Sequence, residues 1–233
     1  MSLHLAADTA HRERLDRDGF LVVDRPLVDP LELADAQAVV DGVMSNYDQM
    51  PPSTARDLGD VKVHPGPPRI AEVMGVLRLA PELQLMGVYA AMGALAMEVL
   101  GGAVVNLSDH AIYKSAGDGP ETGWHQDLAY ARRPVTQQAI TVWLPLQAVT
   151  TANGCMEFVP GSHHLGLLAH HRLHHDERAH ALVTDEVDPT VAVACPLPAG
   201  GATVHWATTL HRTGPNRTDT VRRAWITTWC LDG

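Results

Sequence analysis

The stretch "AITVWLPLQAVTTANGCMEFVP", residues 139–160, sets the character of the second half of the chain. Two short runs rich in β-branched and aromatic residues flank a polar segment, a pattern typical of β-strands. Asn153 and Gly154 lie between the two runs. An Asn-Gly pair in this position predicts a tight hairpin that joins them.

Further runs of the same kind follow Gly102 and are separated by Gly, Pro and Asn. They are AVVNL (103–107), HAIYK (110–114), TVAVAC (190–195), ATVHW (202–206) and RRAWITTW (222–229). So many short strands in succession predict an antiparallel sandwich or barrel.

The first half of the chain has a different pattern. Helices are predicted over residues 9–19, 29–47 and 81–102, a short strand over 20–24, and a Pro- and Gly-rich loop over 51–69. We therefore expect an α+β fold with a mainly β core. It forms one domain over residues 1–233, with a helical part to about residue 102 and a β-roll core from about residue 103.

Composition excludes some classes of function. The net charge is −10 and 45% of the residues are hydrophobic, so we expect no nucleic-acid partner. No run approaches the length of a membrane span, and the polar N-terminus lacks an apolar signal core, so a cytoplasmic location is expected. The scattered Cys155, Cys195 and Cys230 fit reduced thiols. The oligomeric state cannot be read from the sequence.

An H-x-D motif occurs twice in this His-rich chain of 14 histidines, so the motif alone is weak. His125 and Asp127 fall in extended sequence, where residues two apart point the same way. His174 and Asp176 fall in a surface excursion over 163–180 that is predicted to be helix or loop, where such residues diverge. Extended context favours His125 and Asp127.

The excursion also spaces histidines four apart, as His170/His174 and His171/His175. Such pairs can bind a metal on a helix, but no H-E-x-x-H arrangement accompanies them. We interpret this segment as a solvated His-rich face.

A metal site on His125 and Asp127 needs a third ligand from a distant strand. His211 ends one extended run, and Arg222 lies on the strand that returns after a turn. Two His and one carboxylate are the ligand set of mononuclear non-heme iron, and an Arg nearby offers a planar fork for a carboxylate.

Several stretches together resemble the phytanoyl-CoA dioxygenase family of Fe(II)- and 2-oxoglutarate-dependent oxygenases. They are RDGFLVVD (17–24), YKSAGDGPETGWHQD (113–127), VWLPLQAVTTANGCMEFVPGSH (142–163) and AGGATVHWATTLHRTGPNRTDTVRRA (199–224). They appear in the family's order along nearly the whole chain. The resemblance implies a double-stranded β-helix, a cupin-like jelly roll, with N-terminal helices packed outside it.

The resemblance also implies the roles of individual residues. His125, Asp127 and His211 would hold Fe(II) and form the catalytic centre, where O2 reacts. Arg222 and Thr213 would bind the distal carboxylate of the co-substrate 2-oxoglutarate, and Arg223 should point to the opposite face of its strand.

Two further residues, Trp143 and Gln126, match positions that line the co-substrate pocket in the family. Each also has an ordinary structural interpretation, Trp143 as core and Gln126 as a solvent-facing residue.

Asp127 bears on the subtype of reaction. Related halogenases have a small residue at this position, so a carboxylate implies hydroxylation, with succinate and CO2 as co-products. Desaturation, cyclisation and epoxidation stay open.

We expect the primary substrate to be a small metabolite of a biosynthetic pathway that carries an acidic group. Its candidate wall residues are Tyr113, Lys114, Tyr130, Met156, Trp206, Lys62 and His64. The lid is expected from residues 51–69 or 163–190.

Other classes of protein fit parts of the sequence. A cupin-like metalloenzyme could use the same ligands without 2-oxoglutarate, but Arg222 and Thr213 argue against it. The three-ligand set argues against a non-catalytic β-sandwich binding module. A His/Asp hydrolase would need a nucleophile elbow, which the sequence lacks.

Overall fold

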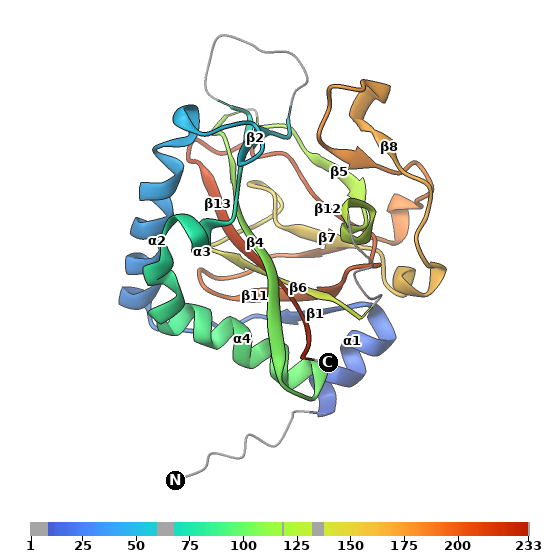
Figure 1. Cartoon of the computed structure of the whole chain (residues 1–233). Helices are drawn as coiled ribbons and strands as arrows, with labels where there is room; N and C mark the ends of the chain where they lie inside the picture. Colours follow the sequence, from blue (N-terminus) through green and yellow to red (C-terminus); the bar gives the residue numbers. More distant parts are fainter. Residues whose placement is uncertain (1–8, 60–67, 118, 132–137, 233) are drawn as a thin grey trace.

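Two β-sheets face each other in the computed structural model, which describes residues 9–59, 68–117, 119–131 and 138–232. Helices α2, α3 and α4 run along one flank of the larger sheet, and α1 lies below it (Figure 1). The α-helices are α1 (Thr9–Asp18), α2 (Pro30–Met44), α3 (Val76–Leu79) and α4 (Gly87–Leu100). Short 3-10 helices are η1 (Tyr47–Gln49), η2 (Pro81–Leu85), η3 (Asp127–Tyr130), η4 (Ser162–Leu165), η5 (Leu173–His175) and η6 (Pro189–Val191).

The larger sheet is antiparallel throughout and has the strand order β1-β11-β6-β13-β4-β3-β2. Its strands are β1 (Phe20–Val23), β2 (Ala55–Asp57), β3 (Ile70–Met74), β4 (Val104–Lys114), β6 (Ile140–Pro145), β11 (Ala202–Trp206) and β13 (Arg222–Leu231). Strands from the N-terminal and C-terminal parts of the chain are neighbours in this sheet. The sheet therefore forms only after segments far apart in the sequence come together.

The smaller sheet has the order β10-β7-β12-β5, and a separate two-stranded ribbon pairs β8 with β9. The strands are β5 (Thr122–His125), β7 (Met156–Phe158), β10 (Val193–Cys195), β12 (His211–Thr213), β8 (His171–Arg172) and β9 (Leu182–Val183). Two facing antiparallel sheets of this kind form the expected double-stranded β-helix with helices outside it. The expected α+β fold with a mainly β core is therefore confirmed.

Strand β6 shows how the two faces of the larger sheet separate. Ile140, Val142 and Leu144 join the core that the helices cover. Trp143 joins a second core between the sheets, with residues of β7, β10 and β13. Successive side chains of a strand point to opposite faces, so the even positions of β6 bury against helices and the odd positions line the interior.

Two acidic side chains at the start of α2 stabilise the N-termini of two helices. Asp29 accepts hydrogen bonds from the backbone N–H groups of Leu31 and Glu32, which caps α2. Glu32 then accepts a bond from the N–H of Val88 at 3.1 Å, in the first turn of α4. The two long helices are thereby held together where α4 begins.

The Asn153–Gly154 turn forms, but the predicted hairpin is wrong. Gly154 has φ +85°, and the N–H of Cys155 bonds to the carbonyl of Thr150. The flanking strands do not pair with each other, because β6 lies in the larger sheet and β7 in the smaller one. The turn is therefore a crossing between sheets.

The N-terminal part contributes more strands than expected. The predicted strand over 20–24 is present as β1, but β2 and β3 also complete the larger sheet, and β2 falls in the segment expected to be loop. The excursion over 163–180 contains η4, η5 and the β8 strand and no α-helix. Within the described ranges, no helix has the length and apolar character needed to cross a bilayer.

Asn216 ties the turn after β12 to β4. It is fully buried, and its amide donates to the carbonyls of Lys114, Ser115 and Thr220, while its oxygen accepts from Thr218. Asn216→Ala would leave buried carbonyls unpaired, so we expect a loss of roughly 2–4 kcal/mol in the free energy of unfolding.

Urea unfolding measures this loss as a lower midpoint with an unchanged slope. The control is the exposed Asn46, whose replacement by Ala should cost less than about 0.5 kcal/mol. Equal midpoints for Asn216→Ala and Asn46→Ala would contradict the assigned role.

Candidate active site

His125, Asp127 and His211 meet where β5 and β12 pair. His211 is the direct cross-strand partner of His125, and their ring centroids are 4.2 Å apart. Gln126 is extended, with φ −122° and ψ 133°, and η3 begins at Asp127. One ligand atom of each residue lies within 4.8 Å of the others, so the three predicted ligands converge as a set that could hold a metal ion.

Backbone carbonyls orient both histidines. The Nδ1 atoms of His125 and His211 lie 2.8 and 2.9 Å from the carbonyls of Gly123 and Thr209. Nδ1 donates in this arrangement, which leaves Nε2 as the free ligand atom. Burial, with the neighbouring His211, lowers the pKa of His125 to about 3, so its ring is neutral.

The two carboxylate oxygens of Asp127 have different neighbours: one accepts hydrogen bonds from the protein, and the other lies near the two histidines. Oδ2 accepts from the hydroxyl of Thr141 at 2.6 Å and from Nε2 of His205 at 3.1 Å. Oδ1 lies 3.4 Å from His211 Nε2 and 3.8 Å from His125 Nε2. Burial raises the pKa of Asp127, but the surrounding histidines outweigh burial and hold it well below its usual value, so the carboxylate is ionised.

His205 and Thr141 are site residues that the sequence reasoning missed. They are cross-strand partners on β11 and β6, and both side chains face the interior. Burial, with the neighbouring His211, lowers the pKa of His205 to about 4, and its buried Nδ1 has no hydrogen-bond partner among the described residues. The alternation of "TVHW" (203–206) could have placed His205 inward, but nothing local names its partner.

Arg222 is the first residue of β13. Its charge is buried, and no carboxylate of the described residues pairs with it. It is 1% exposed, and its guanidinium lies 5.4 Å from the ring of Trp143. Its Nη1 reaches the carbonyl of Ile112 at 3.4 Å, whereas Nε is buried and has no partner among the described residues. Burial lowers the pKa of Arg222 to about 9, so it is still charged at neutral pH.

Thr213 completes a place for a carboxylate. Its buried Oγ1 also lacks a partner among the described residues, and Thr213 is two residues after His211 on β12. Residues two apart on a strand share a face and are about 6.6 Å apart, which suits a short dicarboxylate. Lys114, the cross-strand partner of Arg222, donates to the carbonyl of Thr213 and so links Arg222 to this position. Two unpartnered buried donors beside the triad therefore fit the expected co-substrate.

Gln126 has another role than the expected contact with 2-oxoglutarate. It is fully buried, and its amide nitrogen donates to the carbonyls of Gly166 and Thr208. Its amide oxygen accepts from the N–H of Leu168, and its backbone N–H donates to His170. The side chain is therefore occupied in anchoring the 163–180 excursion beside the metal ligands.

Lys114 is also reassigned. Its side chain is 0% exposed, and Nζ donates to the carbonyls of Pro120, Thr213 and Gly214. All three donors of the ammonium are used, so Lys114 joins β4 to the end of β12 and cannot act as a wall for substrate.

The remaining predicted wall residues are scattered. Tyr113 and Trp206 lie in the core under the helices, where Tyr113 donates to Asp41. Met156 is buried between the sheets with Trp143. Of these side chains only Tyr130 lies beside the triad, with its ring 5.9 Å from that of His125.

Lys62 and His64 lie outside the described residues. As expected, Arg223 points away from Arg222, because its Nε donates to Asp41 of α2.

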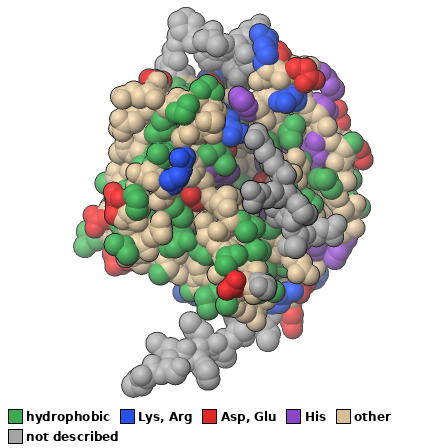
Figure 2. Space-filling view, in the orientation of Figure 1, with side chains coloured by type: hydrophobic (Ala, Val, Ile, Leu, Met, Phe, Trp, Pro, Cys, Tyr) green, Lys and Arg blue, Asp and Glu red, His purple; other side chains and the backbone are tan. Residues whose placement is uncertain are grey.

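The second H-x-D copy does not form a site. Asp176 pairs with Arg178 at 2.6 Å. His171 and His175 stack with ring centroids 3.9 Å apart, and Nε2 of His171 lies 3.1 Å from Asp185. Figure 2 shows His, Arg and acidic side chains gathered at the upper right, over the β8 ribbon. His171, His175 and Asp185 bring ligand atoms within 4.8 Å of one another, so the histidine spacing seen in the sequence gathers a second possible metal-ligand set. Two of its three members are exposed, and the segment stays interpreted as a solvated His-rich face.

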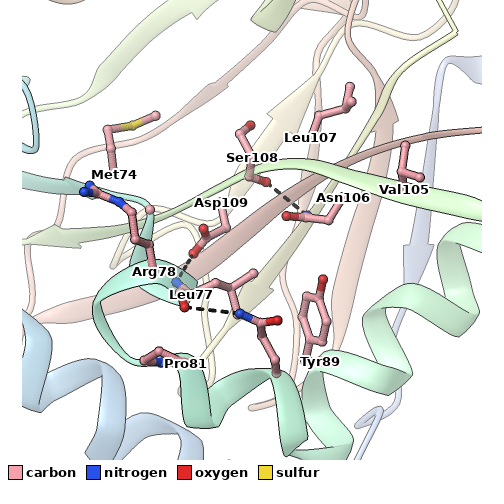
Figure 3. Close-up of a pocket in the computed structure, with 12 residues that line it drawn as sticks. Met74, Leu77, Arg78, Pro81, Tyr89, Val105, Asn106, Leu107, Ser108 and Asp109 are labelled. Carbon is pink, nitrogen blue, oxygen red and sulfur yellow. Dashed lines mark hydrogen bonds between the residues drawn. The ribbon is translucent and has the colours of Figure 1, made fainter.

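A separate surface groove of about 920 Å³ lies on the outer side of β4, beside α3 and α4 (Figure 3). Asp109 in this groove accepts from the N–H of Leu77 and from the indole of Trp225. The carboxylate of Asp109 is therefore used in structural hydrogen bonds. The groove lies on the opposite face of the sheet from the triad.

Comparisons with known proteins agree with this geometry. The family Phytanoyl-CoA dioxygenase (PhyH) matches residues 15–224. The solved structure of EvdO2 from Micromonospora carbonacea var. aurantiaca, complexed with 2-oxoglutarate, is 29% identical with a TM-score of 0.78 and covers 98% of this chain and 93% of that chain. The alpha ketoglutarate dependent epimerase SnoN from nogalamycin biosynthesis is 22% identical with a TM-score of 0.76, over 96% of this chain and 82% of its own, and so shows the fold alone.

Two curated relatives match over a shorter part. A phytanoyl-CoA dioxygenase domain-containing protein of Danio rerio is 28% identical over 127 residues, 52% of this chain and 43% of the relative. A probable alpha-ketoglutarate-dependent hypophosphite dioxygenase of Stutzerimonas stutzeri is 30% identical over 126 residues, again 52% of this chain and 43% of the relative. The chain thus covers less than half the length of these two relatives. Because the family match extends over most of the chain and the fold agrees with those of the solved structures, this protein belongs to the phytanoyl-CoA dioxygenase family.

Proposed function

We propose that this protein is an Fe(II)- and 2-oxoglutarate-dependent oxygenase that hydroxylates a C–H bond of a small molecule, with succinate and CO2 as co-products. The observation that carries the proposal is the buried guanidinium of Arg222, which no carboxylate of the described residues pairs with, beside a His–Asp–His set. A buried charge without a partner is costly, so its retention indicates a ligand that supplies the missing carboxylate.

Each residue has a defined task in this proposal. His125, His211 and Oδ1 of Asp127 would hold the iron on one side and leave other positions open. Arg222 and Thr213 would hold the distal carboxylate of 2-oxoglutarate by charge-assisted hydrogen bonds. The iron, when bound, supplies the activation of O2 and the oxidation of the substrate.

The two rival classes explain less of this arrangement. A cupin-like metalloenzyme that does not use 2-oxoglutarate leaves Arg222 and Thr213 without a ligand. A binding module has no need for three oriented metal ligands. Asp127 favours hydroxylation over halogenation, because its carboxylate lies where a halogenase of this kind would leave room for chloride.

The first test concerns the co-substrate. Fe(II) and 2-oxoglutarate added without oxygen should give the weak visible absorption of the chelate, and air should then release succinate. Arg222→Met should lower the affinity for 2-oxoglutarate on the order of 10- to 100-fold, since a charged hydrogen bond contributes about 1.5–3 kcal/mol.

The same substitution should stabilise the ligand-free protein by about 1–4 kcal/mol, because it removes an unpaired buried charge. Arg223→Met is the control: it loses the bond to Asp41 but should keep normal 2-oxoglutarate affinity. Absence of the absorption band and of succinate in the wild type would refute the proposed function.

The second test concerns Asp127. Asp127→Gly removes one ligand and should abolish transfer of oxygen to a substrate identified by a metabolite screen. Product analysis by mass spectrometry decides the matter, and normal hydroxylated product from this variant would exclude Asp127 as a ligand.

The third test concerns His205 as a positioning residue. His205→Phe removes one of the two donors to Oδ2 of Asp127, so iron affinity should fall on the order of 10- to 100-fold. Competition with a metal chelator measures the affinity. Thr203→Val on the same strand is the control, since Thr203 Oγ1 has no partner among the described residues. Similar iron affinities in both variants would show that His205 does not position Asp127.

A further inference from the structure

A second group of charged side chains faces the interior, on the strands β2, β3 and β4. Arg56 pairs across strands with Glu72, and Glu72 pairs with Ile112. Directly paired residues share a face, and Ile112 packs on the core between the sheets. His110, two residues before Ile112, faces the same way. Arg56, Glu72 and His110 therefore face the space into which the iron ligands also point.

The contacts within this cluster leave one cation without a close partner. Glu72 is 6% exposed, and its Oε1 lies 3.1 Å from Nδ1 of His110. Arg56 Nη1 stays 4.0 Å from Oε2 of Glu72, which is too long for a hydrogen bond. Arg56 Nε is buried and has no partner among the described residues. An ion pair that served only the fold would close this gap and use the Nε donor.

The cluster contains two basic side chains and one carboxylate. Burial lowers the pKa of His110, but the hydrogen bond and charge of Glu72, with the charge of Asp127, raise it above its usual value. His110 therefore keeps a proton to higher pH than a free histidine. One carboxylate thus faces Arg56 and a histidine that protonates more readily than a free one, and an anion beside Arg56 would complete the set.

The cluster lies within reach of a molecule held at the iron ligands. Thr141, which donates to Asp127, is on β6, and the strands lie in the order β3-β4-β13-β6. Neighbouring strands are about 4.8 Å apart and residues rise about 3.3 Å along a strand, so Glu72, which lies level with Pro145 of β6, is about 20 Å from Thr141 along the interior face. His110, which lies level with Trp143 of β6, is nearer, at about 12 Å from Thr141. The influence of Asp127 on His110 agrees with this short separation.

We propose that Arg56, Glu72 and His110 form a recognition subsite for an anionic group, a carboxylate or a phosphate, of the primary substrate. Arg56 binds the anion through its Nε edge, while Glu72, held by His110, competes with the anion for the guanidinium. The proposal rests on the proposed oxygenase function, because it places this group at one end of a substrate whose other end is oxidised. It also distinguishes this anion from 2-oxoglutarate, which Arg222 would bind.

The test measures binding of three matched probes by calorimetry. The probes are cyclohexanecarboxylate, cyclohexyl phosphate and the neutral cyclohexanecarboxamide. They are added at millimolar concentration to iron-loaded protein saturated with 2-oxoglutarate under nitrogen, so that Arg222 is occupied. The wild type should bind at least one anion and ignore the amide, and the tighter anion identifies carboxylate or phosphate as the natural group.

Two substitutions in the cluster have opposite expected signs. Arg56→Gln should weaken anion binding on the order of 10- to 100-fold. Glu72→Gln removes the competing carboxylate, so anion binding should be equal or tighter. Arg78→Gln, an exposed arginine beside the outer groove, is the matched control and should change nothing. Arg56→Lys keeps the charge without the Nε edge and should give an intermediate loss, which covers the case in which Arg56→Gln fails to fold.

Three results would overturn the proposal. They are no anion binding by the wild type, equal binding of the amide, or unchanged anion binding in both Arg56 variants. Weaker binding in Glu72→Gln with tighter binding in Arg56→Gln would also overturn it and would indicate a cationic substrate.

A parallel series on metal-free protein, with Arg222→Met included, separates this proposal from the proposed function. Failure of the iron-loaded wild type to bind 2-oxoglutarate would refute the proposed oxygenase function. After that result, anion binding that depends on Arg56 but not on Arg222 would still support the proposed subsite.

Discussion

The guanidinium of Arg222 is buried between two sheets, and no carboxylate of the described chain pairs with it. An unpaired buried charge costs several kcal/mol, and the surrounding residues offset only part of that cost. The guanidinium lies over the ring of Trp143 and makes one long hydrogen bond to the carbonyl of Ile112. The neighbouring Lys114 is a second buried basic side chain, and burial and the charge of Arg222 hold its pKa well below the usual value. Under the proposed function, the distal carboxylate of 2-oxoglutarate supplies the missing partner, so stability without ligand and function oppose each other at this position.

The metal ligands, in contrast, are held by the protein itself. The pairing of β5 with β12 sets His125 opposite His211, and backbone carbonyls fix both rings. Thr141 and His205 hold one oxygen of Asp127 and leave the other toward the histidines. Because these contacts need no metal, the site is preorganised, and iron would enter with little rearrangement.

The sequence was sufficient for features that depend on periodicity and on several motifs in order. Alternation chose His125 and Asp127 over their second copy, and the search for a third ligand named His211 and Arg222. The resemblance added the roles of these residues and the jelly-roll fold. The sequence was insufficient to predict the contacts of Gln126 and Lys114. Their partners are backbone groups that come near only after distant segments of the chain fold together.

The same limit applies to strand pairing. The Asn153–Gly154 turn was correctly placed, yet which strands it joins depends on the order of both sheets. The short strand β2 adds to an edge by pairing with β3, and its own composition does not show this. A pairing partner is a property of the whole fold, so local propensity cannot specify it.

Gln126 holds the excursion at Gly166 and Leu168, and Thr184 returns to bond with the carbonyl of Trp124. The intervening residues therefore form a closed loop whose two ends are fixed beside the iron ligands. The entropy of closing such a loop rises only slowly with its length. Insertions or deletions between the two anchors can therefore reshape the wall over the site without displacing His125 or Asp127. Related enzymes could diversify their substrates in this way through changes in loop length, while the metal-binding geometry stays constant.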